Sequence, residues 1–210
     1  MPSFDIENSC PKLVAGIDEA GRGPWAGPVV AGAVVILDKN LSPYLLENLD
    51  DSKKLSPKKR EQLYKELFSE QEKGHLFIGI GEASCREIDE KNILQATFLA
   101  MKRAAEKLKI HPEFAIIDGN RTPSDFICPT KSVIKGDAKS FSISAASIVA
   151  KVYRDKKMQE MAKIYPYYGF EKNAGYGTAA HISGLKKYGI TPEHRKSYKP
   201  IKEIIDKNFS

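Results

Sequence analysis

The stretch LVAGIDEAGRGPWAGPVVAGAVVIL, from Leu13 to Leu37, decides the fold of this chain. A short apolar run that ends at Asp18 is followed by the breaker-rich GRGPWAGP and then by a second apolar run over 29–37. Short apolar runs bounded by glycine and proline are typical of buried strands. The stretch therefore predicts two strands joined by a glycine-rich turn, with Asp18 and Glu19 at the end of the first.

The rest of the chain alternates between helix and strand patterns. Helices are expected over 56–72, where Ser56 is a suitable N-cap and Pro57 a suitable first residue, over 86–109, and from 141 into the basic stretch 154–157. Further strands are expected over 77–83, 114–117 and 132–134. After Pro166, glycine-rich loops and the short helical patterns 178–189 and 201–207 indicate a C-terminal appendage. This order predicts an α/β protein.

Composition excludes several classes of protein. The 210 residues are 41% hydrophobic and 29% charged, which is too apolar for a disordered chain and sufficient for a packed core. The nine-residue apolar run 29–37 is far shorter than the roughly 20 residues of a membrane-spanning helix. The start MPSFDIENSC does not resemble a secretory signal. We therefore expect a cytoplasmic protein with no membrane partner.

The cysteines and histidines do not form metal-site motifs. Cysteine occurs at three widely spaced positions without a CxxC pair, which predicts reduced structural thiols: Cys10, Cys85 and Cys128. The four histidines lack HxxxH or HExxH spacing, so we expect ordinary surface or turn residues: His75, His111, His181 and His194.

The net charge favours a polyanionic partner. Lysine and arginine number 33 against 27 acidic residues, a balance of +6. Basic side chains that neutralise phosphates supply most sequence-independent affinity for nucleic acids. A lysine-rich surface produces the same balance in many soluble proteins, so charge alone leaves both interpretations open.

Acidic residues lie where the predicted strands stop. Asp18 and Glu19 close the first strand, Asp118 closes the strand 114–117, and Asp137 lies in a KGD turn before a helix. The carboxyl ends of strands in α/β sheets commonly hold the reactive groups. Converging carboxylates need divalent cations between them, and oxygen ligands suit magnesium or manganese. The pattern indicates a two-metal phosphoryl-transfer site. Taken singly, each acid also fits a helix cap or a turn.

Neighbouring residues of a strand point to opposite faces, so Asp18 and Glu19 cannot both reach one site without distortion. The following AGRG segment is flexible enough to permit that distortion. Otherwise, Glu19 contributes through its backbone carbonyl or a bound water.

Several blocks of the sequence, in one order along the chain, resemble bacterial ribonuclease HII, the type 2 ribonuclease H family. They run from about Val14 to Tyr198: GIDEAGRGPWAGPVVAGAV, DSKKLSPKKRE, IIDGN, KGDAKSFSISAASIVAKVYRD, GYGTAAH and TPEHRKSY. The resemblance implies a ribonuclease H-like fold, with a central mixed five-stranded sheet flanked by helices. It implies a catalytic domain over 12–165 and a small helical C-terminal segment over 166–210 that contributes to substrate binding.

The resemblance also implies roles for individual residues. The catalytic, metal-binding acids would be Asp18, Glu19, Asp118 and Asp137, with two Mg²⁺ or Mn²⁺ ions in the active complex. The loop that recognises the ribonucleotide 2'-hydroxyl would be Gly21, Arg22 and Gly23. Tyr176 would stack on the sugar at an RNA–DNA junction.

The residues themselves are compatible with these roles. Glycines let the backbone approach a ligand closely, and the 2'-hydroxyl distinguishes RNA from DNA. Tyr176 lies between two glycines, which leave its ring open for stacking. Candidate phosphate contacts are Lys53, Lys54 and Lys139. A tight turn with a solvated Arg22, a surface tyrosine and solvated lysines remain the alternatives.

The function implied by the resemblance is endonucleolytic hydrolysis of the RNA strand in RNA–DNA hybrids, and cutting 5' of ribonucleotides embedded in duplex DNA. The products would carry 3'-hydroxyl and 5'-phosphate ends. Two alternatives are a nucleic-acid-binding protein without cleavage and a metal-free glycoside hydrolase with a carboxylate pair. We expect a monomer, and no motif identifies a recruiting partner.

Overall fold

The computed structural model describes residues 2–11, 13–52 and 54–208. Its strands are β1 (Val14–Ala20), β2 (Val29–Ile36), β3 (Leu76–Ala83), β4 (Phe114–Asp118) and β5 (Thr130–Val133). Its helices are α1 (Asp5–Asn8), α2 (Pro43–Asn48), α3 (Pro57–Glu72), α4 (Cys85–Lys91), α5 (Ile93–Glu106), the 3₁₀ turn η1 (Gly136–Ala138), α6 (Phe141–Ile164), α7 (Phe170–Asn173), α8 (Ala179–Tyr188) and α9 (Lys199–Asn208).

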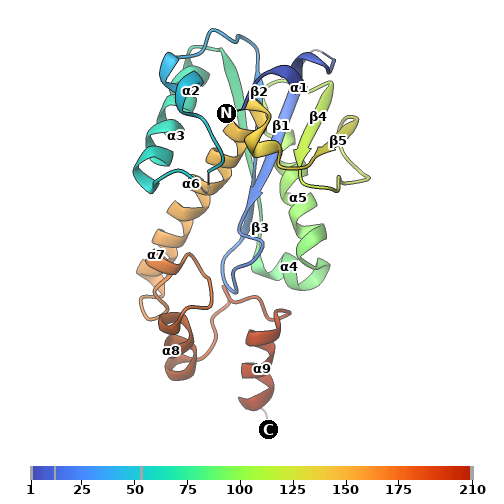
Figure 1. Cartoon of the computed structure of the whole chain (residues 1–210). Coiled ribbons are helices and arrows are strands. Elements are labelled where there is room, and N and C mark those ends of the chain that lie inside the picture. Colours follow the sequence, from blue (N-terminus) through green and yellow to red (C-terminus); the bar gives the residue numbers. More distant parts are fainter. Residues whose placement is uncertain (1, 12, 53, 209–210) are drawn as a thin grey trace.

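The strands form one mixed sheet in the order β3-β2-β1-β4-β5. The first three strands of the chain pair antiparallel, and β4 and β5 continue the sheet parallel to β1. Figure 1 shows α5 on one side of this sheet and α6, with α2 and α3 beside it, on the other. The prediction of a mixed five-stranded sheet flanked by helices is confirmed.

Residues of β1 alternate between the two helical layers. Ala15 and Ile17 belong to the apolar cluster that includes α5. Val14 packs with Ile143 of α6 on the other face. Because side chains alternate along a strand, Asp18 falls on the face covered by α6 and Glu19 on the face covered by α5. The neighbouring acids are thus separated by the pleat of the strand.

Two glycines let α6 lie directly on the sheet. A Cβ added to Gly16 would lie 2.3 Å from the Ser142 carbonyl carbon, and one added to Gly32 would lie 2.5 Å from the Ala146 carbonyl oxygen. Both contacts are with backbone, which has no flexible end that could move aside. The absence of these two side chains therefore sets the distance between β1 and the start of α6.

The expected helix over 86–109 is wrong as a single element, because α4 and α5 meet at Asn92. This residue has a φ of 71°, in the left-handed region. Its side-chain oxygen accepts hydrogen bonds from the amides of Leu94 and Gln95, so Asn92 is the N-cap of α5. The apolar stripe identifies a helical period but does not reveal a side chain that starts a new helix within it.

Two strand ends also differ from the prediction. β1 continues past Asp18 to Ala20, because its pairing with β2 extends to Ala20 and Val30. β5 spans 130–133 rather than 132–134, since Thr130 and Lys131 pair with β4.

The C-terminal segment packs on the glycine-rich turn after β1. Its buried side chains Phe170, Leu185 and Ile201 form one apolar cluster with Ala26 and Met158. Figure 1 shows α7, α8 and α9 beyond one end of the sheet. Among the described helices, none combines the length and apolarity of a membrane span.

The histidine prediction is wrong for two residues of this segment. His181 and His194 are fully buried, and their Nε2 atoms lie 3.0 Å apart. Burial lowers the pKa of both rings, that of His194 to about 4. They are packing residues between Tyr168 and Phe170. The three cysteines are free, as the sequence predicts.

Gly32→Ala tests the close contact between α6 and the sheet. The added methyl group would overlap the Ala146 carbonyl, so the substitution should lower the free energy of unfolding by about 1–3 kcal/mol. Urea denaturation followed by circular dichroism measures this change. An unchanged unfolding midpoint would contradict the contact.

Candidate active site

Two acidic side chains are brought together by the parallel pairing of β1 and β4. Ile17 pairs with Ile117 at the end of this ladder. The next residues along the two strands are Asp18 and Asp118, which therefore lie beside each other. The Asp18 side chain is buried, whereas Asp118 is partly exposed at the last position of β4.

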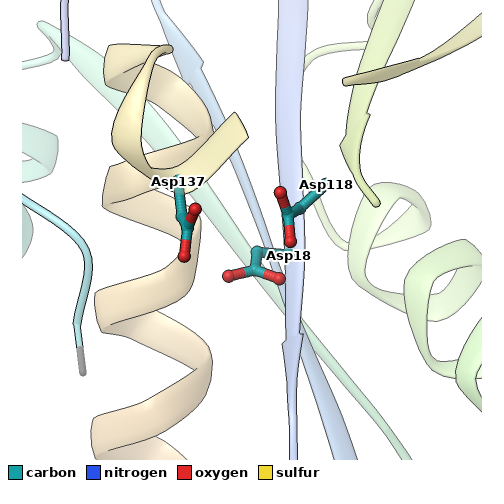
Figure 2. A group of neighbouring side chains, drawn as sticks. All are labelled: Asp18, Asp118 and Asp137. Carbon is teal, nitrogen blue, oxygen red and sulfur yellow. The ribbon is translucent and has the colours of Figure 1, made fainter. Parts of the chain in front are cut away.

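The third acid, Asp137, comes from the turn between β5 and α6. Lys135 takes a left-handed conformation with a φ of 56°, and the chain then enters η1. The Gly136 amide donates a hydrogen bond to Asp118 Oδ1 at 2.6 Å. Figure 2 shows the three carboxylates converging from β1, the end of β4 and η1.

Asp137 is not the cap of the following helix. The Ser140 hydroxyl accepts from the Ile143 amide at 3.2 Å, which makes Ser140 the N-cap of α6. Asp137 is nevertheless buried. The capping interpretation of Asp137 is thereby wrong.

One oxygen each of Asp18, Asp118 and Asp137 lies within 4.8 Å of the other two. Burial and the nearby charges of Glu19 and Asp118 raise the pKa of Asp18 well above its usual value. Hydrogen bonds from Ser147 and from the Glu19 amide, the latter at 2.7 Å, act in the opposite direction. The environment of Asp18 therefore disfavours the ionised form of its carboxylate.

A divalent cation fits this cluster. Carboxylate oxygens are hard ligands of the kind that magnesium and manganese prefer. A cation between the three acids would reverse the electrostatic cost of the buried Asp18 charge. The donor set and the raised pKa of Asp18 thus agree with a metal centre held by Asp18, Asp118 and Asp137.

Glu19 lies outside this group of three. Its Oε1 accepts from Arg22 Nη1 at 3.2 Å. Glu19 and Arg22 line a cavity of about 220 Å³ together with Asp118, Asn120 and Arg121. The alternation of β1 accounts for this position, and the role of Glu19 in metal binding stays a prediction.

The predicted loop and the predicted tyrosine share a second cavity, of about 390 Å³. Its lining includes Asp18, the loop residues Gly21, Arg22 and Gly23, and Tyr176. Tyr176 is 51% exposed, and a Cβ added to Gly23 would lie 3.4 Å from its Cε1 atom. The structure thus brings an exposed aromatic ring, a glycine-rich loop and a buried carboxylate to one cavity.

The predicted phosphate-binding lysines are less closely grouped. The Lys54 side chain is 58% exposed and contacts Asp50 Oδ1 at 3.2 Å. Lys139 is exposed, and its Nζ donates to the Ile134 carbonyl at 2.8 Å. Lys53 lies outside the described residues.

Sequence reasoning missed four residues of the larger cavity: Ser52, Ser147, Lys151 and Arg154. Ser52 and Ser147 join through their hydroxyls at 2.9 Å. Ser147, Lys151 and Arg154 follow one another in α6 at spacings of four and three residues, which places them on one helical face. This spacing could have placed the three α6 residues at the site from the sequence. The position of Ser52 beside Ser147 could not be predicted, because it depends on a contact between distant parts of the chain.

Asp18→Asn tests the electrostatics of the three-acid cluster. It removes the buried charge, so without metal the variant should be more stable than the unchanged protein by an amount on the order of 1 kcal/mol. The unchanged protein should gain about 2.7 kcal/mol at a Mg²⁺ or Mn²⁺ concentration 100 times its dissociation constant. The variant should lose most of this gain. Thermal unfolding with EDTA and with each metal measures both effects.

Asp125→Asn is the matched control, because Asp125 is exposed and pairs with Lys102 away from the cluster. It should leave both effects unchanged. A metal-dependent gain that survives in the Asp18 variant would contradict the assignment of Asp18 as a ligand.

Comparison with known proteins identifies the family. The family model described as Ribonuclease HII matches residues 15–201. A ribonuclease HII of Rhodospirillum rubrum is 52% identical over 205 residues, which cover 98% of this chain and 92% of the relative.

Two solved structures support the same fold. The ribonuclease H2 of Pyrococcus horikoshii OT3 has a TM-score of 0.74 at 30% identity, covering 92% of this chain and 97% of its own. A Bst-RNase HIII in complex with Mn²⁺ has a TM-score of 0.75 at 16% identity, covering 98% of this chain and 73% of its own. The latter likeness concerns the fold alone. The expected ribonuclease H-like fold is confirmed, and the chain belongs to the ribonuclease HII family of endonucleases.

Proposed function

We propose that this protein hydrolyses the RNA strand of RNA–DNA hybrids and cuts on the 5' side of ribonucleotides embedded in duplex DNA. The products carry 3'-hydroxyl and 5'-phosphate ends. The observation that supports this most strongly is the convergence of Asp18, Asp118 and Asp137 beside the cavity of the glycine-rich loop and Tyr176. The proposed catalytic carboxylates and the proposed recognition surface therefore lie beside each other.

The proposed cofactor is a pair of Mg²⁺ or Mn²⁺ ions. By the resemblance to ribonuclease HII, Asp18, Asp118 and Asp137 would hold the ions, and Glu19 would complete the site; the first three acids converge in the structure. When bound, the ions supply an activated water and compensate charge on the departing oxygen. The protein supplies the positions of the carboxylates, and no side chain is needed as a nucleophile.

The hydrogen bonds around the acids restrict their orientation. The Gly136 amide holds Asp118, and the Glu19 amide holds Asp18 Oδ1. Ser147 contacts Asp18 and is itself joined to Ser52. These contacts fix the ligand oxygens before any substrate arrives, which lowers the cost of assembling the site.

Recognition of the ribonucleotide is assigned to the Gly21–Gly23 loop and to Tyr176. The loop offers backbone groups at close range, and the hydroxyl both donates and accepts. The loop that carries Tyr176 is itself held, because Asn173 donates to the Tyr168 carbonyl and accepts from the Gly175 amide. Tyr176 is thus presented on a supported loop.

The domain roles, the phosphate contacts, the cellular location and the oligomeric state are also part of the proposal. The region 12–165 carries the acids, and the segment 166–210 contributes Tyr176. Lys53, Lys54 and Lys139 are assigned to phosphates outside the cutting site. The free cysteines fit a reducing cytoplasm. We propose a monomer that acts on nucleic acid without a membrane partner.

Cleavage of a duplex with one ribonucleotide tests the proposed function. The protein with Mg²⁺ or Mn²⁺ should produce one cut on its 5' side, resolved on a denaturing gel. EDTA should abolish the cut, and Asp18→Asn should reduce it by at least about 100-fold, because the metal-bound water is lost. A matched all-DNA duplex should stay intact.

The outcomes separate the alternatives. An intact ribonucleotide strand with tight binding would favour a nucleic-acid-binding protein without cleavage. Equal cutting of the all-DNA duplex would remove the claim of hydroxyl recognition. Cleavage that persists in EDTA would contradict the metal requirement.

Tyr176→Ala tests the stacking role. Loss of the ring should lower kcat/KM at a single ribonucleotide by about tenfold, if contact with the sugar contributes as much as the lower part of the range for a base–aromatic stack. Tyr176→Phe keeps the ring and should stay within about twofold. Tyr188→Ala is a control, because this exposed ring stacks on Tyr167 instead of lining the cavity. Equal rates for Tyr176→Ala and the unchanged protein would show that the ring does not contact the substrate.

A further inference from the structure

Two arginines are among the largest fully buried side chains of the protein. Arg154 is 2% exposed and Arg195 is 0% exposed. Burying a guanidinium is costly unless its donors are satisfied. Each must therefore make contacts that compensate its removal from water.

Most donors of both arginines bond to the turn between β1 and β2, and the exception for Arg154 is Nη1, which donates to the Ala174 carbonyl at 3.0 Å. Arg154 donates to the carbonyls of Pro28 at 3.0 Å and Ala26 at 3.2 Å. Arg195 donates to the Gly27 carbonyl from Nε at 3.0 Å and to the carbonyls of Gly21 and Arg22 from its two terminal nitrogens. Backbone carbonyls of this turn thus take the place of a carboxylate partner.

The turn depends on these donors because glycines weaken its own conformational preferences. Gly21 and Gly27 have φ values of 94° and 85°. A Cβ added to Gly21 would lie 1.9 Å from Arg154 Nε. The glycine-rich turn and the guanidinium are therefore in direct contact, with no room for a side chain between them.

Planar peptide geometry connects these carbonyls to the proposed recognition surface. In a trans peptide the carbonyl and the following N–H point in opposite directions. The carbonyls of Gly21 and Arg22 point toward buried Arg195, so the amides of Arg22 and Gly23 point away from it. Within the described part of the chain, neither amide donates a backbone hydrogen bond. The two amides are therefore available to a ligand in the cavity that Gly21, Arg22 and Gly23 line.

We propose that Arg195 and Arg154 are positioning residues that set the peptide planes of the Gly21–Gly23 loop for a nucleotide carrying a 2'-hydroxyl. The proposal rests on the proposed function and extends it, because it attributes the selectivity for the 2'-hydroxyl to the two buried arginines that hold the loop. Arg195 acts most directly, since it holds the two carbonyls whose peptides carry the available amides. Arg154 binds the carbonyls of Ala26 and Pro28, in the part of the turn that leads into β2.

The planar fork of arginine is essential to this role. Arg195 uses Nε and both terminal nitrogens, and its guanidinium also lies 5.2 Å from the centre of the Tyr198 ring. Lysine would keep the charge but has a single nitrogen, which cannot reach all these carbonyls. Arg195→Lys and Arg195→Gln should therefore have similar effects on selectivity.

Tyr198 offers a milder perturbation of the same network. Its hydroxyl accepts from Arg195 Nη1 at 3.0 Å and donates to the Arg22 carbonyl. Tyr198→Phe removes only this hydroxyl from a partly exposed residue, so the fold should persist even if an Arg195 variant does not fold.

The test measures selectivity rather than activity alone. KM is determined for cleavage of a duplex with one ribonucleotide, and the inhibition constant Ki for the matched all-DNA duplex as competitor. Arg195→Lys should raise KM about tenfold, the loss expected from a misaligned hydrogen bond, and change Ki by less than about twofold. Tyr198→Phe should shift the ratio of Ki to KM in the same direction by about two- to threefold.

Arg103→Lys is the matched control, because Arg103 bonds to Glu87 and to the Glu82 carbonyl without contacting the turn. It should leave the ratio unchanged. A parallel change of KM and Ki in folded Arg195 and Tyr198 variants, or no change in either, would overturn the positioning role. Failure of the unchanged protein to cut the ribonucleotide duplex would overturn the proposed function instead.

Discussion

Repulsion among three carboxylates is the constraint on which the rest of this structure depends. Asp18, Asp118 and Asp137 would separate if their backbones allowed it, since each charge disfavours its neighbours. The parallel β1–β4 ladder places the first two, and the turn into α6 places the third. Glycines 16 and 32 keep α6 close enough for that turn to reach the strand ends. The core therefore holds three carboxylates close together, at a position where a divalent cation would stabilise their charges.

Local patterns in the sequence predict most of the fold. The apolar runs, the Ser56–Pro57 helix start and the alternation of strand and helix predicted an α/β protein. The mixed five-stranded sheet was implied by the resemblance to ribonuclease HII, and the structure confirms it. The break at Asn92 could not be predicted, because the apolar stripe continues through it. The burial of His181 and His194 was also missed, since it arises from packing between segments whose spacing has no motif.

In the candidate site, too, some residues could be predicted from the sequence and others could not. The acids could be proposed because they follow predicted strands, and the alternation of a strand already separated Asp18 from Glu19. The buried arginines could not be distinguished from surface arginines in a basic sequence. Their role depends on carbonyls more than 120 positions away along the chain, a relation that no local pattern contains.

The most direct test of the account is the location of metal in crystals of the protein grown with Mn²⁺, measured by anomalous scattering. The account predicts density about 2.1 Å from carboxylate oxygens of Asp18, Asp118 and Asp137. Manganese bound elsewhere, with these three carboxylates left free of metal, would contradict it.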